Sequence, residues 1–280
     1  MVYDKNNPLK VVTLCSGYDS QCMALERLKK SHPGFDYELV AWSEIDKYAI
    51  QLHNANFPQW ADRNLGDMTK IDWSKVSDFD LLTYSTPCQS ISQAGLQKGI
   101  EEGSGTRSSI LWYTRYAILQ KRPKFLLMEN VKALVTKKFL PFFNMWKNEL
   151  ESYGYDNFAQ VLNASDYGVP QNRERIFLVS IRNDGKENRY RFPKKMPLEK
   201  HLVDVLESNV DEKYYLSDKM LEYFNRVNED VTHCHKFKPR GVEDNAFTIR
   251  TRPGERVDDN FIKIKYEGSK DSASDQERIH

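Results

Sequence analysis

Short apolar runs alternate with longer stretches in which apolar residues recur at helical spacing. Apolar runs bounded by turn residues predict buried strands, and the helical spacing predicts amphipathic helices. Strands separated by helices are typical of an α/β fold, with an open, mostly parallel sheet covered on both faces. In such folds functional residues gather at the carboxyl ends of the strands. The predicted strands are 10–15, 37–43, 80–84, 124–128, 158–162 and 175–181, and the predicted helices are 20–30, 47–56, 110–120 and 140–153.

The pattern changes after Ile181. Residues 183–197 are polar and interrupted by glycine and proline, and no regular alternation follows them. We therefore predict one large domain at 1–184 and a smaller, irregular lobe at 185–280. Within the lobe, 246–252 has the pattern of a strand. The polar segment 267–280 lacks a capping element and predicts a loop or disorder.

Composition and charge exclude several classes of protein. Hydrophobic residues make up 40% of the 280 and charged residues 29%, and no apolar run reaches the ~18 residues of a membrane span. The polar N-terminus does not have the pattern of a signal peptide. The four cysteines fit neither a disulfide framework nor a zinc site, so we expect a cytoplasmic protein without a bound metal.

The net charge of +1 is unlike that of a protein that coats DNA. Two locally basic stretches, 182–200 and 236–256, nevertheless flank an acidic stretch at 201–230. The basic stretches could follow a phosphate backbone, or they could be ordinary solvated surface.

Small and acidic residues follow the first predicted strands. The turn at 14–17 would let the backbone approach a ligand closely, although it matches a GxGxxG phosphate loop poorly. Glu44 follows the second strand, where a carboxylate suits ribose hydroxyls or caps a helix, and Asp46 suits the cap better. Asp67 could accept a hydrogen bond from an adenine amino group. Together these features indicate a nucleoside cofactor without a pyrophosphate, such as S-adenosylmethionine (SAM).

Two further strand ends carry candidate catalytic groups. Cys88 follows a strand in a loop with Pro87, where a thiolate could act as a nucleophile, although a single cysteine is more often a small buried residue. Glu129 ends a very apolar strand, so desolvation should raise its pKa and suit it to proton donation; otherwise it only caps the strand. Arg173 and Arg175 lie on the same side of an extended segment.

Taken in order, these segments resemble the cytosine-5 DNA methyltransferase family. The resemblance runs from residue 11 to residue 181. Its segments are Leu14-Cys15-Ser16-Gly17, Ser43-Glu44-Ile45-Asp46, Gly66-Asp67, Pro87-Cys88-Gln89-Ser90 with Ser92-Gln93-Ala94-Gly95, Arg107-Ser108-Ser109-Ile110-Leu111-Trp112, Glu129-Asn130-Val131 and Tyr167-Gly168-Val169-Pro170-Gln171-Asn172-Arg173-Glu174-Arg175.

The resemblance implies a Rossmann-like SAM-dependent methyltransferase sheet with a target-recognition lobe. It implies methyl transfer from SAM to C5 of a cytosine flipped out of double-stranded DNA in a bacterial or phage-infected cell, as in restriction-modification systems. Cys88 would add to C6, Glu129 would act at N3, Arg175 would bind O2, and Arg173 would support the loop or a phosphate. The glycine-rich loop 90–105 would be a lid, or alternatively a disordered surface loop.

The implied residues fall into two further groups. Those expected to bind the cofactor are Leu14, Cys15, Ser16, Gly17, Glu44, Ile45, Asp67, Met68 and Pro87. Those expected to contact DNA are Gln89, Ser90, Arg107, Lys236, Arg240, Arg250 and Arg252.

The sequence departs from the family in two places. Ser16, Asp19 and Ser20 replace glycines of the first motif. An Arg-rich helix motif and a Gly-Asn-Ser-Val-like segment do not occur before His280, so we expect a truncated recognition domain, or a second chain that supplies the missing part, and weak SAM binding by this chain alone. Two alternatives remain: a tRNA cytosine-5 methyltransferase and a non-catalytic DNA-binding relative. The presence of both Cys88 and Glu129 argues against the second.

Overall fold

The computed structural model describes residues 2–87, 107–185, 187–208, 210–232, 235–249, 256–266 and 276–279. The chain forms two compact units. The first consists of Met1–Val161 and Arg175–Phe192, and the second of Leu162–Glu174 and Pro193–His280. The assignment of 1–184 to catalysis and 185–280 to target recognition stays a prediction.

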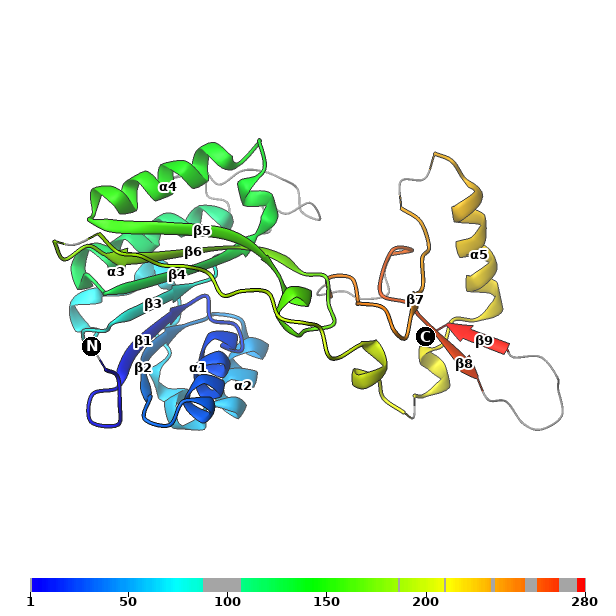
Figure 1. Cartoon of the computed structure of the whole chain (residues 1–280), viewed down its shortest axis with the longest axis horizontal. Helices are drawn as coiled ribbons and strands as arrows, with labels where there is room; N and C mark the ends of the chain where they lie inside the picture. Colours follow the sequence, from blue (N-terminus) through cyan, green and yellow to red (C-terminus); the bar gives the residue numbers. More distant parts are fainter. Residues whose placement is uncertain are drawn as a thin grey trace. The chain divides into compact units, whose positions relative to one another are not determined.

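A six-stranded sheet with the order β2-β1-β3-β4-β6-β5 forms the centre of the first unit (Figure 1). β1 pairs in parallel with β2 and β3, and β3 in parallel with β4, whereas β4 and β6 are antiparallel. The parallel pairs bring the carboxyl ends of four strands to one edge. The strands are β1 Leu9–Leu14, β2 Tyr37–Ser43, β3 Leu81–Tyr84, β4 Phe125–Val131, β5 Tyr155–Asn163 and β6 Glu174–Arg182.

Helices cover both faces of this sheet, as the sequence pattern predicts. Because neighbouring strand residues point to opposite faces, Val11 and Val12 belong to different cores. Val11 packs with Cys22 of α1, and Val12 lies in the core that contains Ile118 of α3 and Trp146 of α4. The helices are α1 Ser20–Ser31, α2 Lys47–Asn56, α3 Thr114–Lys121 and α4 Leu140–Ser152.

Short 3-10 helices connect many of these elements. The helix expected at 110–120 is divided into such a segment, η4, followed by α3. The 3-10 helices are η1 Pro58–Arg63, η2 Met68–Lys70, η3 Trp73–Lys75, η4 Arg107–Tyr113, η5 Lys132–Val135, η6 Ala164–Tyr167, η7 Leu202–Val205 and η8 Glu212–Tyr214.

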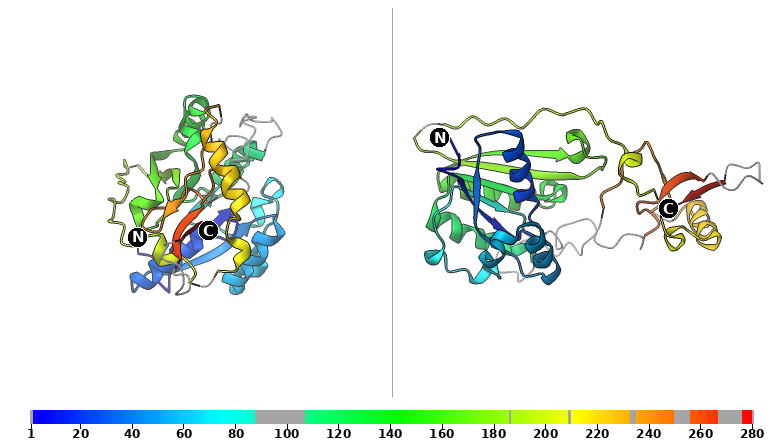
Figure 2. Two further views of the ribbon diagram at one scale, coloured as in Figure 1. Left: turned by 90° about the vertical axis from the view of Figure 1, so that its right-hand side faces the viewer. Right: turned by 90° about the horizontal axis from the view of Figure 1, so that it is seen from below.

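The second unit contains helix α5 (Asp218–Glu229) and a small sheet with the order β7-β8-β9 (Figure 2). Its strands are β7 Arg240–Gly241, β8 Ile262–Tyr266 and β9 Gln276–Ile279. The ring of Phe224 on α5 lies 4.9 Å from that of Phe237 and 5.3 Å from that of Phe261, measured between centroids. These three rings make a local core under the helix.

Two expectations for this unit are wrong. The segment expected as a strand at 246–252 forms only an isolated bridge from Ala246 to Gln171, and its described residues 247–249 are not in a strand. The segment expected to be irregular at 267–280 contains β9, which pairs with β8 through main-chain hydrogen bonds that a polar sequence can also make. Within the described ranges, no helix has both the length and the apolar character needed to cross a membrane.

Candidate active site

A cavity of about 540 Å³ lies at the carboxyl ends of β1, β2 and β3. Its volume is typical of sites that enclose a small organic ligand. Residues from each of the three strand ends contribute to its wall, together with η2 and η4. The lining residues are Cys15, Ser43, Glu44, Ile45, Asp46, Gly66, Asp67, Met68, Thr69, Pro87 and Ile110.

Glu44 is held at this cavity by main-chain amides. Its Oε1 accepts hydrogen bonds from the amides of Ile45 and Asp46 at 2.8 and 2.9 Å. Its Oε2 accepts one from the amide of Gly17 at 2.9 Å. Three such donors hold the Glu44 carboxylate in a fixed orientation. Asp46 caps α2 by accepting from the amides of Tyr48 and Ala49, as the sequence suggests.

The turn after β1 contributes to the site mainly through its backbone. Gly17 has a φ of 58°, a left-handed conformation that glycine adopts without strain. The amide of Ser16 donates to the carbonyl of Ser43 at 3.2 Å, which ties the turn to β2. The side chain of Leu14 lies in the core with 1% exposure, and neither Ser16 nor Gly17 is among the cavity-lining residues.

Asp67 lies on the same wall and caps η2. Its Oδ1 accepts from the amide and the hydroxyl of Thr69 at 3.0 and 2.8 Å. These hydrogen bonds lower the pKa of Asp67. Besides Asp46, which caps α2, the cavity wall therefore carries the carboxylates of Glu44 and Asp67, beside apolar surface from Ile45, Met68 and Ile110.

The Cys15 thiol faces these carboxylates. Burial, followed by the charges of Glu44 and Asp67, raises the pKa of Cys15 to about 12. Its sulfur lies 3.4 Å from the sulfur of Met68. Because the thiolate is the reactive form of cysteine, Cys15 is a poor nucleophile.

The segment that leads from β3 to Cys88 is anchored on both sides. Asn130, which is 2% exposed at the end of β4, donates through Nδ2 to the carbonyl of Thr86 at 3.1 Å. Gln21 of α1 donates through Nε2 to the hydroxyl of Ser85 at 2.8 Å. Cys88 lies outside the described residues. These hydrogen bonds hold the main chain of Thr86 and the side chain of Ser85, two and three residues before it.

Glu129 and Arg175 form an ion pair across β4 and β6. Arg175 Nε lies 3.0 Å from Glu129 Oε1, with side-chain exposures of 17% and 28%. The antiparallel register places Arg175 opposite Val131, close to Glu129. A neighbouring guanidinium favours the ionised carboxylate, whereas burial favours the protonated form. The role of Glu129 as a proton donor therefore stays a prediction.

Arg173 belongs to the second unit, where its Nη1 lies 3.5 Å from the carbonyl of Ile249. Its main-chain amide donates to Asn163 Oδ1 at 2.8 Å. These contacts agree with support of a loop, one of the two roles expected for Arg173.

The residues expected to contact DNA are described only in part. Lys236 donates to three main-chain carbonyls at the end of α5, at 2.6 to 3.3 Å, so its ammonium caps this helix. The Nε of Arg240 donates to the carbonyl of Asn245 at 3.0 Å, and its guanidinium lies over the Phe247 ring at 4.8 Å. Arg107 lies in η4, but its side chain is not described. The remaining candidates, Gln89, Ser90, Arg250 and Arg252, lie outside the described residues.

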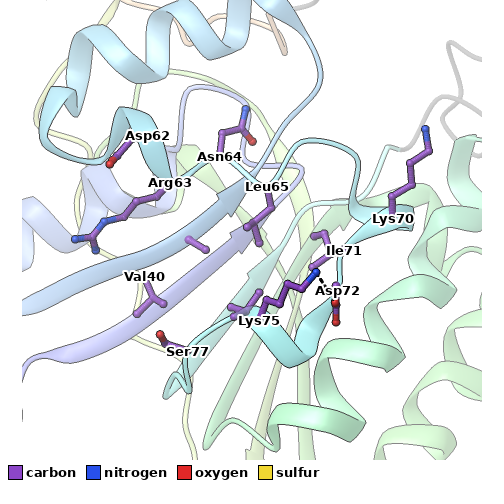
Figure 3. A pocket seen from close by; sticks show the side chains of 12 residues that line it. Val40, Asp62, Arg63, Asn64, Leu65, Lys70, Ile71, Asp72, Lys75 and Ser77 are labelled. Carbon is purple, nitrogen blue, oxygen red and sulfur yellow. Dashed lines mark ion pairs between the residues drawn. The ribbon is translucent and has the colours of Figure 1, made fainter.

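A second cavity of about 360 Å³ lies beside β2 and is lined by Val40, Leu65 and the cationic residues Arg63, Lys70 and Lys75 (Figure 3). Arg63 Nη1 pairs with Glu38 at 2.8 Å. Lys75 pairs with Asp72 at 3.2 Å, and Lys70 with Asp67 at 3.5 Å. Since its cations have partners within the protein, this cavity does not resemble an anion site.

Among the described residues, no group of three or more His, Cys, Asp or Glu side chains could hold a metal ion.

The family model of C-5 cytosine-specific DNA methylases matches residues 9–278. The type II methyltransferase M2.ScrFI of Lactococcus lactis subsp. cremoris is 49% identical over 208 residues, covering 74% of this chain and 57% of that protein. The orphan methyltransferase M.SssI of Spiroplasma monobiae is 42% identical over 76% of this chain and 58% of its own length. The chain thus spans little more than half the length of these relatives.

Among solved structures, Dnmt2 methyltransferase of S. pombe aligns with a TM-score of 0.68 over 93% of this chain and 77% of its own, at 16% identity. A mutant of Spodoptera frugiperda DNMT2 aligns with a TM-score of 0.67 over 92% and 75%, at 21% identity. At these identities the likeness concerns the fold, and it confirms the predicted Rossmann-like methyltransferase sheet.

Proposed function

Because this chain belongs to the C-5 cytosine-specific DNA methylase family, we propose that it transfers a methyl group from SAM to C5 of a cytosine in double-stranded DNA. The observation that carries the proposal is the position of Pro87. This residue lines the 540 Å³ cavity and directly precedes Cys88 in the sequence. A cofactor in the cavity would therefore lie next to the proposed nucleophile.

The cavity fits the chemistry of SAM. Glu44 offers a fixed carboxylate to ribose hydroxyls, and Asp67 offers one to an adenine amino group. Ile45, Met68 and Ile110 give apolar surface for the base. SAM has no diphosphate, which agrees with a turn after β1 that lacks a phosphate-binding loop.

SAM, when bound, supplies an electrophilic methyl group. The Cys88 thiolate would form a bond to C6 of the cytosine, so that the electron pair of the C5–C6 double bond becomes available at C5 for the methyl group that SAM would supply, with S-adenosylhomocysteine as the leaving group. A base next removes the C5 proton, and the C6–sulfur bond breaks to release Cys88. Glu129 would act at N3 of the ring and Arg175 would bind O2, and the ion pair between these two side chains supports the assignment of both to one site.

The target carbon is inaccessible within a stacked duplex, so the cytosine must leave the helix to reach Cys88. We assign recognition of the surrounding DNA to residues 185–280, where Arg240 is a candidate for a phosphate or guanine contact.

The proposal is tested with duplex DNA that contains 5-fluorocytosine. The fluorine cannot leave as a proton does, so the reaction should stop at a covalent complex whose formation requires both SAM and Cys88. Cys88→Ser is the test variant. Cys15→Ser is the matched control and is assayed at saturating SAM, because Cys15 lines the cofactor cavity at the end of another strand of the same sheet. Absence of a SAM-dependent complex with the unaltered chain would contradict the proposal. Methyl incorporation into tRNA but not into duplex DNA would show that the substrate is tRNA, while the proposed chemistry at cytosine C5 would remain.

A further inference from the structure

Asp19 is a buried carboxylate at the turn expected to carry the cofactor. It is 0% exposed and has a left-handed φ of 63°. Aspartate adopts this conformation more readily than most residues do, but burial of its charge is costly without compensation. The sequence pattern does not explain an ionisable group at this position.

Asp19 holds the turn together through several hydrogen bonds. Its Oδ2 accepts from the Thr13 hydroxyl at 2.8 Å, and its Oδ1 accepts from the amide of Cys22 at 3.2 Å, which caps α1. Its own amide donates to the carbonyl of Ser16 at 2.8 Å. The residue thus closes the loop that carries Gly17, whose amide donates to Glu44.

The side chain of His53, on α2, lies close to the Asp19 carboxylate. It is 0% exposed and lies flat against Trp42, with ring centroids 3.7 Å apart. Its Nε2 lies 3.6 Å from Asp19 Oδ2, beyond hydrogen-bond distance but close enough for an ion pair. Its Nδ1 lies 3.4 Å from Asn54 Oδ1. Both ring nitrogens therefore lie near side-chain oxygen atoms.

The other ionisable groups near the pair do not supply a positive charge. Burial raises the pKa of the Cys22 thiol and of the Tyr37 phenol, so both stay neutral. Glu26 accepts a hydrogen bond from Tyr37 at 2.9 Å and adds a second acid to this side of α1. His53 is a neighbouring side chain that can pair with the Asp19 carboxylate as a cation.

We propose that His53 is a positioning residue for cofactor binding: its charge stabilises the buried Asp19 carboxylate, which shapes the turn at 16–19 against Glu44. This inference rests on the proposed function, since it assigns the turn to SAM. It assigns a role to an α2 residue whose side chain does not line the cavity.

A double-mutant cycle tests the coupling. Asp19→Asn removes the charge and retains a residue that tolerates the left-handed conformation, and His53→Phe retains the ring against Trp42 without its nitrogens. Binding of S-adenosylhomocysteine is measured by titration calorimetry. In the chain that retains Asp19, we expect His53→Phe to weaken binding of S-adenosylhomocysteine about tenfold. In the chain that already carries Asp19→Asn, the same substitution should weaken binding less than about twofold. Tyr37→Phe, in the same core, is the matched control and should change affinity by less than about twofold.

Each outcome decides the inference. Equal losses from His53→Phe in both backgrounds would show a packing role and overturn it, as would NMR spectra that show an unprotonated His53 ring nitrogen facing Asp19. His53→Gln, a smaller neutral substitution, enters the cycle if the phenylalanine variant does not fold. Failure of the unaltered chain to bind S-adenosylhomocysteine would overturn the proposed function together with the inference. Binding with additive losses would overturn the inference alone.

Discussion

Asn130→Ala should separate catalytic positioning from stability. The Asn130 amide joins the end of β4 to the loop that leads to Cys88: its Nδ2 donates to the carbonyl of Thr86 at 3.1 Å, and its Oδ1 accepts from the amide of Val131 at 2.9 Å. Alanine removes both hydrogen bonds and leaves the Thr86 carbonyl without this donor. The loop can then move relative to β4, which carries Glu129.

The two effects differ in size. Loss of the hydrogen bond from the Val131 amide costs about 1 kcal/mol, and the buried Thr86 carbonyl left without its donor costs about 1–3 kcal/mol, so unfolding should become easier by about 2–4 kcal/mol. This is less than the ~5–15 kcal/mol typical of a folded domain, so the variant should still fold. A displacement of about 1 Å at a reacting group can slow a reaction about a hundredfold. We therefore expect a large loss of rate in a folded protein.

The assay is a single-turnover measurement of methyl transfer, combined with urea unfolding. Asn157→Ala is the matched control, because Asn157 Nδ2 also donates to a main-chain carbonyl, that of Lys147, at 3.1 Å. Both variants should lose similar stability, and only Asn130→Ala should lose about two orders of magnitude in rate. Equal rates for the two variants would refute the role of Asn130 in positioning the loop.

Three shorter predictions follow. Gln21→Ala and Ser85→Ala should each slow formation of the 5-fluorocytosine complex about fivefold, with no further loss in the double variant, because they break one hydrogen bond; additive losses would contradict this. With its pKa raised to about 12, Cys15 should resist iodoacetamide near neutral pH and react after unfolding, as peptide mass spectrometry would show; rapid labelling of the native thiol would contradict its protonated state. Thr69→Val should raise the lowered pKa of Asp67, measured by NMR. The stabilisation that Asp67 contributes is present above its unfolded pKa of about 4 and is lost as the pH falls through the folded pKa. Because the variant has a higher folded pKa, it should lose this stabilisation at a higher pH. An unchanged titration of the Asp67 carboxyl would exclude the Thr69 hydroxyl as a cause of the lowered pKa.

The sequence predicts the first unit closely because its strands β1, β2 and β3 are buried along most of their length. Such strands are short apolar runs, and both β2 and α2 begin and end where the pattern indicates. The same topology explains why the motif residues Glu44, Asp67 and Pro87 line one cavity: parallel strands bring their carboxyl ends together.

Contacts between distant side chains were not predictable in the same way. Gln21 and Ser85 are far apart in the sequence, and neither residue type indicates which side chain it will bond to. His53 shows the same limit, since a lone histidine on a helix has no spacing that links it to Asp19. Such pairs depend on how α1 and α2 pack on the sheet, which periodicity does not specify.

The second unit was predicted poorly because little of it repeats. Helix α5 does carry a helical signal, because Leu221, Phe224 and Val227 recur at helical spacing and the last two are buried, and the sequence interpretation overlooked it. The partners of Phe224, which are Phe237 and Phe261, lie in irregular segments. A core built from single aromatic residues leaves no alternation for a sequence pattern to detect.

Electrostatics gives a physical reason why the cofactor wall and the nucleophile belong to different strand ends. Cys15 follows β1 and Cys88 follows β3, so position along the sheet does not distinguish them. The carboxylates of Glu44 and Asp67, which suit a nucleoside, also suppress the thiolate of Cys15. A cysteine that acts as a nucleophile is therefore expected at a strand end other than that of β1, and the proposed nucleophile, Cys88, follows β3 in the sequence.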